Sequence, residues 1–252
     1  MAWVLLLVYT GYLIWAYFAE SVNNKRVYEP WRTHYYTQYP YEGGDNDSVK
    51  FSAEDGAALT RKETKPGVME RYAGLLQINE ELVGWITIPG TAVDYPVVKT
   101  DNNDFYLDHN VYKEPAKAGS IFMDFRNTGT AEDLHTILYG HNMKDGSMFG
   151  GLMRYKKKDF FDRHPVIEFN TLYAEMKWEI FSVYVTAAEF YYIETCFPTL
   201  DAYGYFLDSI KNRSLFKSDT GVTIEDRILT LSTCSYEFGD ARFVVHAKRI
   251  ND

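Results

Sequence analysis

Short runs in which apolar and polar residues alternate fill most of the chain beyond residue 80. Alternation with a period of two puts every second side chain on one face, which is typical of a half-buried β-strand. Turn-forming residues separate the runs, and this many short strands favour a closed barrel over an open sheet. The predicted strands are the eight segments 84–88, 92–98, 120–124, 136–139, 166–169, 177–187, 228–233 and 242–249.

Two segments carry their apolar residues at helical spacing instead. Within 68–82, this spacing predicts a helix that leads into the first strand. Within 198–216, the apolar residues Leu200, Tyr203 and Leu207 share one face, which predicts an amphipathic helix inserted before the seventh strand. The pattern therefore indicates a mostly β domain with one leading helix and one inserted helix.

The first 19 residues contain no charge and are rich in Leu, Val, Trp and Tyr. As a helix they would span roughly 28 Å at 1.5 Å per residue, which is close to the hydrocarbon thickness of a bilayer. We therefore expect residues 1–19 to form a transmembrane anchor in the lipid bilayer, with a cleaved signal peptide as the alternative. Residues 20–67 are polar and turn-rich and predict an irregular extracellular spacer. Its aromatic residues, such as Trp31 and Tyr35, either meet the lipid headgroups or pack against the domain.

The overall composition limits the class of protein. With 252 residues, of which 46% are hydrophobic, the chain can bury one substantial core, which we assign to residues 68–252. Its net charge of −9 argues against a nucleic-acid partner. The histidines, cysteines and acidic residues show no metal-ligand spacing, and no glycine-rich phosphate loop is present, so we predict neither a metal nor a cofactor.

One cysteine and one arginine stand at facing ends of two predicted strands. Cys234 ends the alternating run 228–234 and Arg242 opens the next run, so their side chains can face each other. A thiol at a strand end beside a positive charge can ionise, and the thiolate is the reactive species. With two cysteines in the chain, a reactive Cys234 leaves Cys196 unpaired, and we expect Cys196 in or near the core as a small apolar residue.

A nucleophilic cysteine also needs a proton acceptor. His141 has the most suggestive setting, because it lies just past the glycine that ends a predicted strand. His246 shares a strand face with Arg242 and is a second histidine that could approach the site. From the residues alone, structural and catalytic roles for Cys234, His141 and Arg242 remain equally open, whereas a position outside the site is favoured for His246.

The segment 230–234, Thr-Leu-Ser-Thr-Cys, resembles the TLxTC signature of the sortases, the cysteine transpeptidases that attach secreted proteins to the cell wall of Gram-positive bacteria. The resemblance implies a closed, eight-stranded sortase-type β-barrel and an enzyme of the thiol-protease class. It also implies a single-pass protein of the cell membrane whose catalytic domain lies on the extracellular side. Further segments resemble the class B branch in the family's order, namely 83–91, 94–98, 119–124, 139–143 and 148–149.

The resemblance implies a role for each of the three reactive side chains. The thiolate of Cys234 attacks the carbonyl of a threonine in the C-terminal sorting signal of a secreted protein. Arg242 binds the oxyanion through its rigid fork. His141 gives a proton to the departing amine and takes one from the incoming amine of a peptidoglycan precursor or the cell wall.

A substrate groove is also implied, although ordinary packing is the alternative role for each residue that lines it. The groove residues expected from the resemblance are Tyr139, Ser232, Asn103, Leu107, Tyr192 and Ile193. In some relatives an acidic residue follows the cysteine, whereas Ser235 stands here, so a Cys–His–Arg arrangement is favoured over a Cys–His–Asp triad. Two rival functions stay open: a thiol hydrolase that releases its substrate to water, and a catalytically silent wall-binding module.

Overall fold

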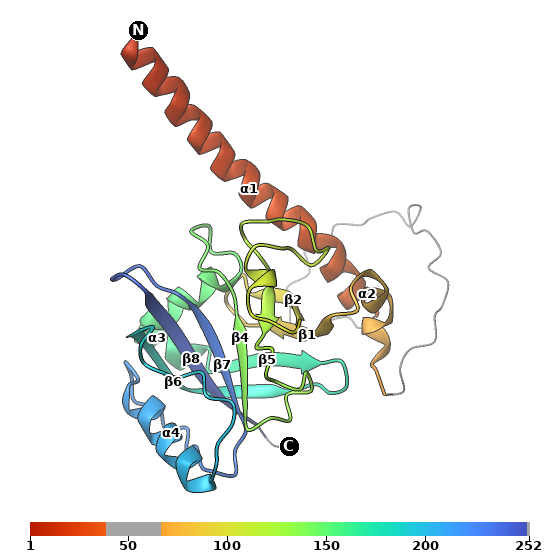
Figure 1. The fold of residues 1–252 in the computed structure, drawn as a ribbon, viewed down its shortest axis with the longest axis vertical. Coiled ribbons are helices and arrows are strands. Elements are labelled where there is room, and N and C mark those ends of the chain that lie inside the picture. The colour runs from red at the N-terminus through yellow and green to blue at the C-terminus, as the bar shows by residue number, and fades with distance from the viewer. Residues whose placement is uncertain (39–66, 251–252) are drawn as a thin grey trace.

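Eight strands close into a barrel in the computed structural model, which describes residues 1–38 and 67–250 (Figure 1). Around the barrel the strands follow the order β1-β2-β3-β4-β7-β8-β6-β5. The prediction of a closed, eight-stranded barrel is therefore confirmed. The strands are β1 (Leu82–Thr87), β2 (Asp94–Val98), β3 (Ile121–Met123), β4 (His135–Tyr139), β5 (Val166–Thr171), β6 (Lys177–Ala187), β7 (Ile228–Cys234) and β8 (Ala241–Arg249).

The pairing of β4, β7 and β8 decides which strand ends meet. β4 runs parallel to β7, with Tyr139 beside Ser232, and β8 returns antiparallel to β7. The carboxyl ends of β4 and β7 and the amino end of β8 therefore lie at one edge of the barrel. Residues that follow β4, end β7 or begin β8 come together at this edge although they are far apart in the sequence.

Apolar residues pack on both faces of this part of the barrel wall. Leu231 and Val245 belong to the main core. Tyr184 and Val244 belong to a second apolar cluster on the outer face, which α4 (Leu200–Asn212) covers. Figure 1 shows α4 outside the barrel, next to β6. The inserted helix predicted before the seventh strand is confirmed, and it closes over one side of the sheet.

The chain enters the barrel through a short helical segment made of η1 (Glu70–Tyr72) and α2 (Ala73–Ile78). This segment confirms the predicted leading helix but ends early, because Leu82 is already the first residue of β1. Apolar periodicity cannot reveal elements of one to three turns, and it missed three of them. These are η2 (Phe105–Leu107), η3 (Phe149–Lys156) and α3 (Lys158–Arg163).

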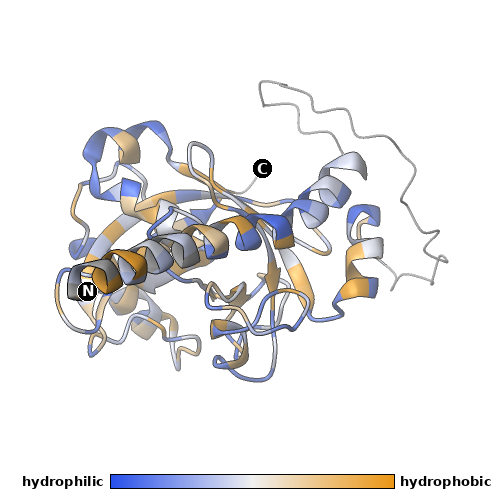
Figure 2. Cartoon of the chain, turned by 90° about the horizontal axis from the view of Figure 1, so that it is seen from above, coloured by the Kyte–Doolittle hydropathy of each residue, from blue (hydrophilic) through white to orange (hydrophobic). Residues whose placement is uncertain are grey.

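The N-terminal helix α1 is one continuous element from Ala2–Gln38. Within residues 1–38 and 67–250, no helix is long and apolar enough to cross a membrane, so the predicted transmembrane helix over 1–19 is not supported. Aromatic and polar residues such as Tyr9, Thr10 and Tyr12 interrupt the aliphatic ones, and pale residues alternate with orange ones along this part of α1 in Figure 2. The helix also continues without a break into polar turns.

The second half of α1 packs against the barrel. Tyr28 and Trp31 are fully buried, and the Tyr35 ring stacks on Trp85 of β1 with their centroids 4.3 Å apart. The prediction of an irregular chain from residue 20 is therefore wrong for residues 20–38, because a stripe of aromatic side chains turns this segment into a docked helix. The remainder of the predicted spacer, residues 39–66, lies outside the described part of the chain.

Candidate active site

The candidate nucleophile and the candidate oxyanion donor stand opposite each other at the edge where β7 ends. Cys234 pairs with Arg242 in the antiparallel register of β7 and β8. Side chains of directly opposed residues lie on the same face, with Cβ atoms about 4.5–5.5 Å apart. Both residues are half-buried, and no carboxylate in the described part of the chain forms an ion pair with Arg242. One of its N–H groups bonds to the Ala241 carbonyl at 3.2 Å, which leaves the other donors available to a ligand.

His141 is placed beside this pair by the sharp end of β4. A Cβ atom added at Gly140 would lie 2.4 Å from Ile121 Cδ1 and 2.9 Å from the Phe149 ring, so a larger residue would force these two buried side chains to shift. The Gly140 amide donates to the Ser232 carbonyl at 3.3 Å, and the Asn142 side chain donates to the Cys234 carbonyl at 3.0 Å. His141 therefore lies between two hydrogen bonds that tie its loop to the end of β7.

One hydrogen bond sets the tautomer of His141. Its Nε2 atom lies 2.7 Å from the carbonyl oxygen of Leu107. Because a carbonyl only accepts, Nε2 carries the hydrogen, and Nδ1 is the atom that can take up and release a proton. In the described part of the chain no carboxylate bonds to His141, so a Cys–His–Asp triad is not formed there.

The three candidate catalytic side chains share one cleft with all the residues expected to form the groove. The cleft has a volume of about 350 Å³ and opens at the edge where β4, β7 and β8 meet. One side is lined by five residues of the segment 188–199 between β6 and α4, which we call the wall segment. The nine predicted residues that line the cleft are Cys234, His141, Arg242, Tyr139, Ser232, Asn103, Leu107, Tyr192 and Ile193. Six lining residues had no predicted role in the site, namely Phe122, Gly140, Ala188, Phe190, Tyr191 and Thr233.

The wall segment is bonded to the floor of the cleft. The Tyr192 hydroxyl lies 2.7 Å from Ser232 Oγ. Burial raises the pKa of the Tyr192 phenol, so this ring stays neutral and its hydroxyl serves as a hydrogen-bonding group. Cys196 is exposed on the same segment, so its predicted place in or near the core is wrong. The segment crosses the surface before α4 begins, which keeps that thiol in solvent.

His246, the second histidine considered, does not line the cleft. It is fully buried, with Nε2 2.8 Å from the Tyr184 hydroxyl and Nδ1 2.6 Å from Thr230 Oγ1. The same threonine oxygen lies 2.6 Å from His135 Nε2, and His135 Nδ1 lies 2.5 Å from the Glu194 carbonyl. Burial lowers the pKa of His246 well below its ordinary value and the pKa of His135 to about 4, so both rings are neutral.

The position after Cys234 carries no acid, as the sequence indicates. Ser235 is buried, and its amide donates to the Ala241 carbonyl at 2.8 Å, which closes the turn between β7 and β8. The nearest acid along the chain, Glu237, accepts hydrogen bonds from Ser235 and from Lys156 of η3. This arrangement holds the turn next to Cys234 but directs the carboxylate to a lysine.

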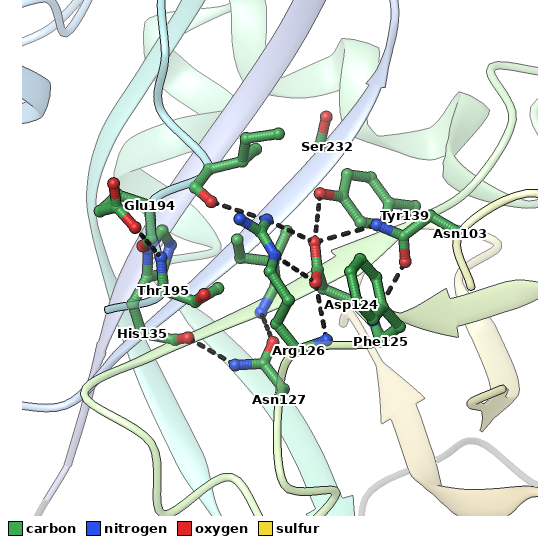
Figure 3. Close-up of polar contacts among 12 residues, drawn as sticks. Asn103, Asp124, Phe125, Arg126, Asn127, His135, Tyr139, Glu194, Thr195 and Ser232 are labelled. Carbon is green, nitrogen blue, oxygen red and sulfur yellow. Dashed lines mark hydrogen bonds and ion pairs between the residues drawn. The ribbon is translucent and has the colours of Figure 1, made fainter. Parts of the chain in front are cut away.

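Sequence reasoning missed an ion pair that lies behind the cleft. Asp124 follows β3 and is fully buried, and Arg126 bonds to both of its carboxylate oxygens, at 2.8 and 2.7 Å (Figure 3). A charged pair two residues apart at the end of an apolar strand is the signal that could have revealed it. Its contacts reach several lining residues of the cleft.

Comparison with known proteins gives a consistent result. Residues 86–250 match the family model of the sortase domain. Sortase B of Listeria monocytogenes is 44% identical over 217 residues, which cover 83% of this chain and 87% of the relative. The solved structure of Bacillus anthracis sortase B in complex with AAEK1 is 46% identical with a TM-score of 0.69, covering 73% of this chain and 86% of that one. A Staphylococcus aureus sortase B–substrate complex is 40% identical with a TM-score of 0.69, covering 74% and 87% of the two chains. The chain therefore belongs to the sortase family, in its class B branch.

Proposed function

We propose that this protein is a cysteine transpeptidase that joins the threonine carboxyl of a C-terminal sorting signal to a cell-wall amine through a thioacyl-enzyme intermediate. The observation that carries the proposal is the cleft in which Cys234, Arg242 and His141 meet. Membership of the sortase family supports a transpeptidase. Residues 68–252 would carry this activity.

In the first half of the reaction, the Cys234 thiolate forms a bond to the carbonyl carbon of the threonine, and the carbonyl electron pair moves to oxygen. Arg242 would bind that oxygen, because its free N–H donors face the cleft from the strand opposite the thiol. When the intermediate collapses, the C–N bond breaks and the amine leaves with a proton from His141. A thioester between Cys234 and the threonine remains.

In the second half, an amine of a peptidoglycan precursor or of the cell wall attacks the thioester carbon. His141 Nδ1 would take the proton from this amine, since Nε2 is held by the Leu107 carbonyl. The C–S bond then breaks, the new amide is released, and the thiolate is restored. Because both substrates are found outside the cell, we propose that the protein acts at the surface of a Gram-positive bacterium.

Purified protein given a sorting-signal peptide, with and without an amine acceptor, tests the proposal. The expected result is a thioester on Cys234 by mass spectrometry and an amide product that forms only when the amine is present. Release of the cleaved acid alone, at a rate that the amine does not change, would identify a thiol hydrolase. Absence of both thioester and product across a range of sorting-signal peptides would favour a silent wall-binding module.

A further inference from the structure

The ion pair between Asp124 and Arg126 lies behind the cleft and lines none of it. Asp124 is fully buried, and a buried carboxylate is costly unless charge and hydrogen bonds compensate it. Arg126 donates Nε at 2.8 Å, Nη2 at 2.7 Å and its backbone amide at 3.0 Å to this carboxylate. Burial raises the pKa of Asp124, but these bonds outweigh it and hold the pKa below its ordinary value, so the pair is ionised.

On one side, the carboxylate binds two residues that line the cleft. Tyr139 of β4 donates its hydroxyl to Asp124 Oδ2 at 2.8 Å, and Asn103 donates its side-chain amide to the same oxygen at 3.1 Å. The side-chain oxygen Oδ1 of Asn103 in turn accepts a hydrogen bond from the backbone amide of Phe125 at 3.0 Å. Figure 3 shows Tyr139 and Asn103 converging on Asp124 from the same side. Asp124 thus sets the positions of one wall and part of the floor.

On the other side, the guanidinium reaches the wall segment. Arg126 Nη2 donates to the carbonyl of Ile193 at 2.8 Å, and Nη1 donates to the hydroxyl of Tyr191 at 3.0 Å. Both residues line the cleft and belong to the wall segment. A single ion pair therefore connects lining residues from three segments that are far apart in the sequence.

We propose that Asp124 and Arg126 are positioning residues that set the width of the substrate groove by holding its two walls at a fixed separation. The inference rests on the proposed transpeptidase function and adds to it, because neither residue touches the substrate. The two rigid forks, carboxylate and guanidinium, fix the distance between Asn103 and Ile193 better than single hydrogen bonds could. Loss of the pair should let the wall segment move away while Cys234, on a different strand end, keeps its place.

The test compares Arg126→Gln with Arg32→Gln. Arg32 of α1 also bonds to an aspartate, with Nε 2.9 Å from the Asp94 carbonyl and 3.4 Å from its Oδ2 atom. The two arginine side chains have similar exposure, 26% for Arg126 and 22% for Arg32, but Asp94 lies on β2 away from the cleft. The Arg32 variant therefore reports the general effect of removing a half-buried guanidinium.

We expect Arg126→Gln to lower kcat/KM for a sorting-signal peptide about 10- to 100-fold, mainly through KM, because the groove no longer matches the substrate. The rate at which iodoacetamide alkylates Cys234 should stay within about twofold of the wild-type rate, since the nucleophile is untouched. Arg32→Gln should leave both quantities close to wild type. For Arg126→Lys, which keeps the charge but not the fork, kcat/KM should lie between the values for Arg126→Gln and Arg32→Gln.

Hydrogen exchange supplies a measurement that does not depend on turnover. The amides of residues 190–197 should exchange about tenfold faster in Arg126→Gln than in wild type, and at the wild-type rate in Arg32→Gln. Unchanged exchange in residues 190–197 of Arg126→Gln would overturn the positioning role, whether or not the wild-type protein turns over peptide. If the wild-type protein turns over no peptide, that result alone counts only against the transpeptidase function. An equal fall in kcat/KM and in alkylation rate would also overturn it. If Arg126→Gln does not fold, the same criteria apply to Arg126→Lys.

Discussion

Two pairs of facing polar residues lie on the outer face of β7 and β8, one at the strand ends and one in the middle of the strands. We call these positions the end level and the middle level, and only the pair at the end level lines the cleft. Cys234 and Arg242 stand opposite each other at the strand ends, and Thr230 and His246 stand opposite each other in the middle. The first pair lines the cleft, whereas the second is fully buried. A few residues along each strand therefore separate a pair that can meet a substrate from one that cannot.

The difference comes from what covers the sheet. α4 and the wall segment lie over the middle level, where Glu194 offers its carbonyl to His135. Because that carbonyl only accepts, His135 Nδ1 donates and its Nε2 accepts from the Thr230 hydroxyl. The Thr230 oxygen then accepts from His246 Nδ1, and His246 Nε2 accepts from Tyr184. Both rings are satisfied while neutral, which makes this level a structural support rather than a reactive site.

The largest expected effect on activity comes from removing the thiol at the strand ends. We expect Cys234→Ala to abolish both thioester formation and transfer, because no other thiol lines the cleft. The thermal midpoint should change little, since a half-buried strand-end side chain contributes little packing. Cys196→Ala should keep most of the activity because that thiol is exposed outside the cleft. A larger loss in Cys196→Ala than in Cys234→Ala would mean that the wrong nucleophile has been chosen.

The next effect in size concerns the cation opposite the thiol. We expect Arg242→Lys to slow thioester formation about 10²- to 10³-fold, or about 3 to 4 kcal/mol, because an ammonium cannot reproduce the fork that holds the oxyanion. Arg242→Ala should be similarly slow. Single-turnover kinetics with a sorting-signal peptide measures the step directly. A near-normal rate in the lysine variant would assign the oxyanion to backbone N–H groups instead.

At the middle level, the same kind of deletion should change stability and not chemistry. Thr230→Val leaves His135 Nε2 and His246 Nδ1 without their shared partner, which should cost about 3 kcal/mol of unfolding free energy. Thr136→Val is the matched control, since the buried Thr136 hydroxyl has no hydrogen-bond partner among the described residues. The unfolding free energy of Thr136→Val should stay within about 0.5 kcal/mol of the wild-type value. Urea unfolding measures both, and equal losses in the two variants would contradict the histidine arrangement.

The smallest effect is a pH dependence of stability. The pKa of His135 is 6.5 in its ordinary state and about 4 in the fold, so the unfolded chain binds the additional proton between these values. Stability that is present above pH 6.5 should therefore be lost as the pH falls towards 4, by about 2 kcal/mol at pH 5 from this group. His246 should add to the loss with the same sign.

Urea unfolding at pH 7.5 and pH 5 checks this dependence. Burial also lowers the pKa of His34, which lies in α1 and not at the middle level, so His34→Gln serves as the control. This variant should still lose most of the unfolding free energy that the wild-type protein loses between pH 7.5 and pH 5. His135→Gln should make the difference in unfolding free energy between the two pH values smaller. Equal unfolding free energies at the two pH values in the wild-type protein would show that the middle level tolerates charge and is not closed.

Local patterns in the sequence determined much of this protein. Alternation with a period of two predicted the barrel strands, and helical spacing predicted α4, because both periodicities arise from the geometry of single elements. The same alternation placed Cys234 at the end of one strand and Arg242 at the start of the next. Their juxtaposition follows from the short turn between two adjacent antiparallel strands.

Tertiary structure alone decided which polar residues are covered and which converge. His246 shares a strand face with Arg242, and no local pattern distinguishes the two, because the cover over His246 comes from α4 and the wall segment. The contacts of Asp124 with Asn103 and Tyr139 likewise join segments whose proximity depends on barrel closure. The aromatic stripe of α1 could have met either lipid or protein, and only its docking on β1 and β2 selects protein for residues 20–38. Burial depends on how the layers of the fold pack against one another, so it cannot be predicted from the pattern of each element separately.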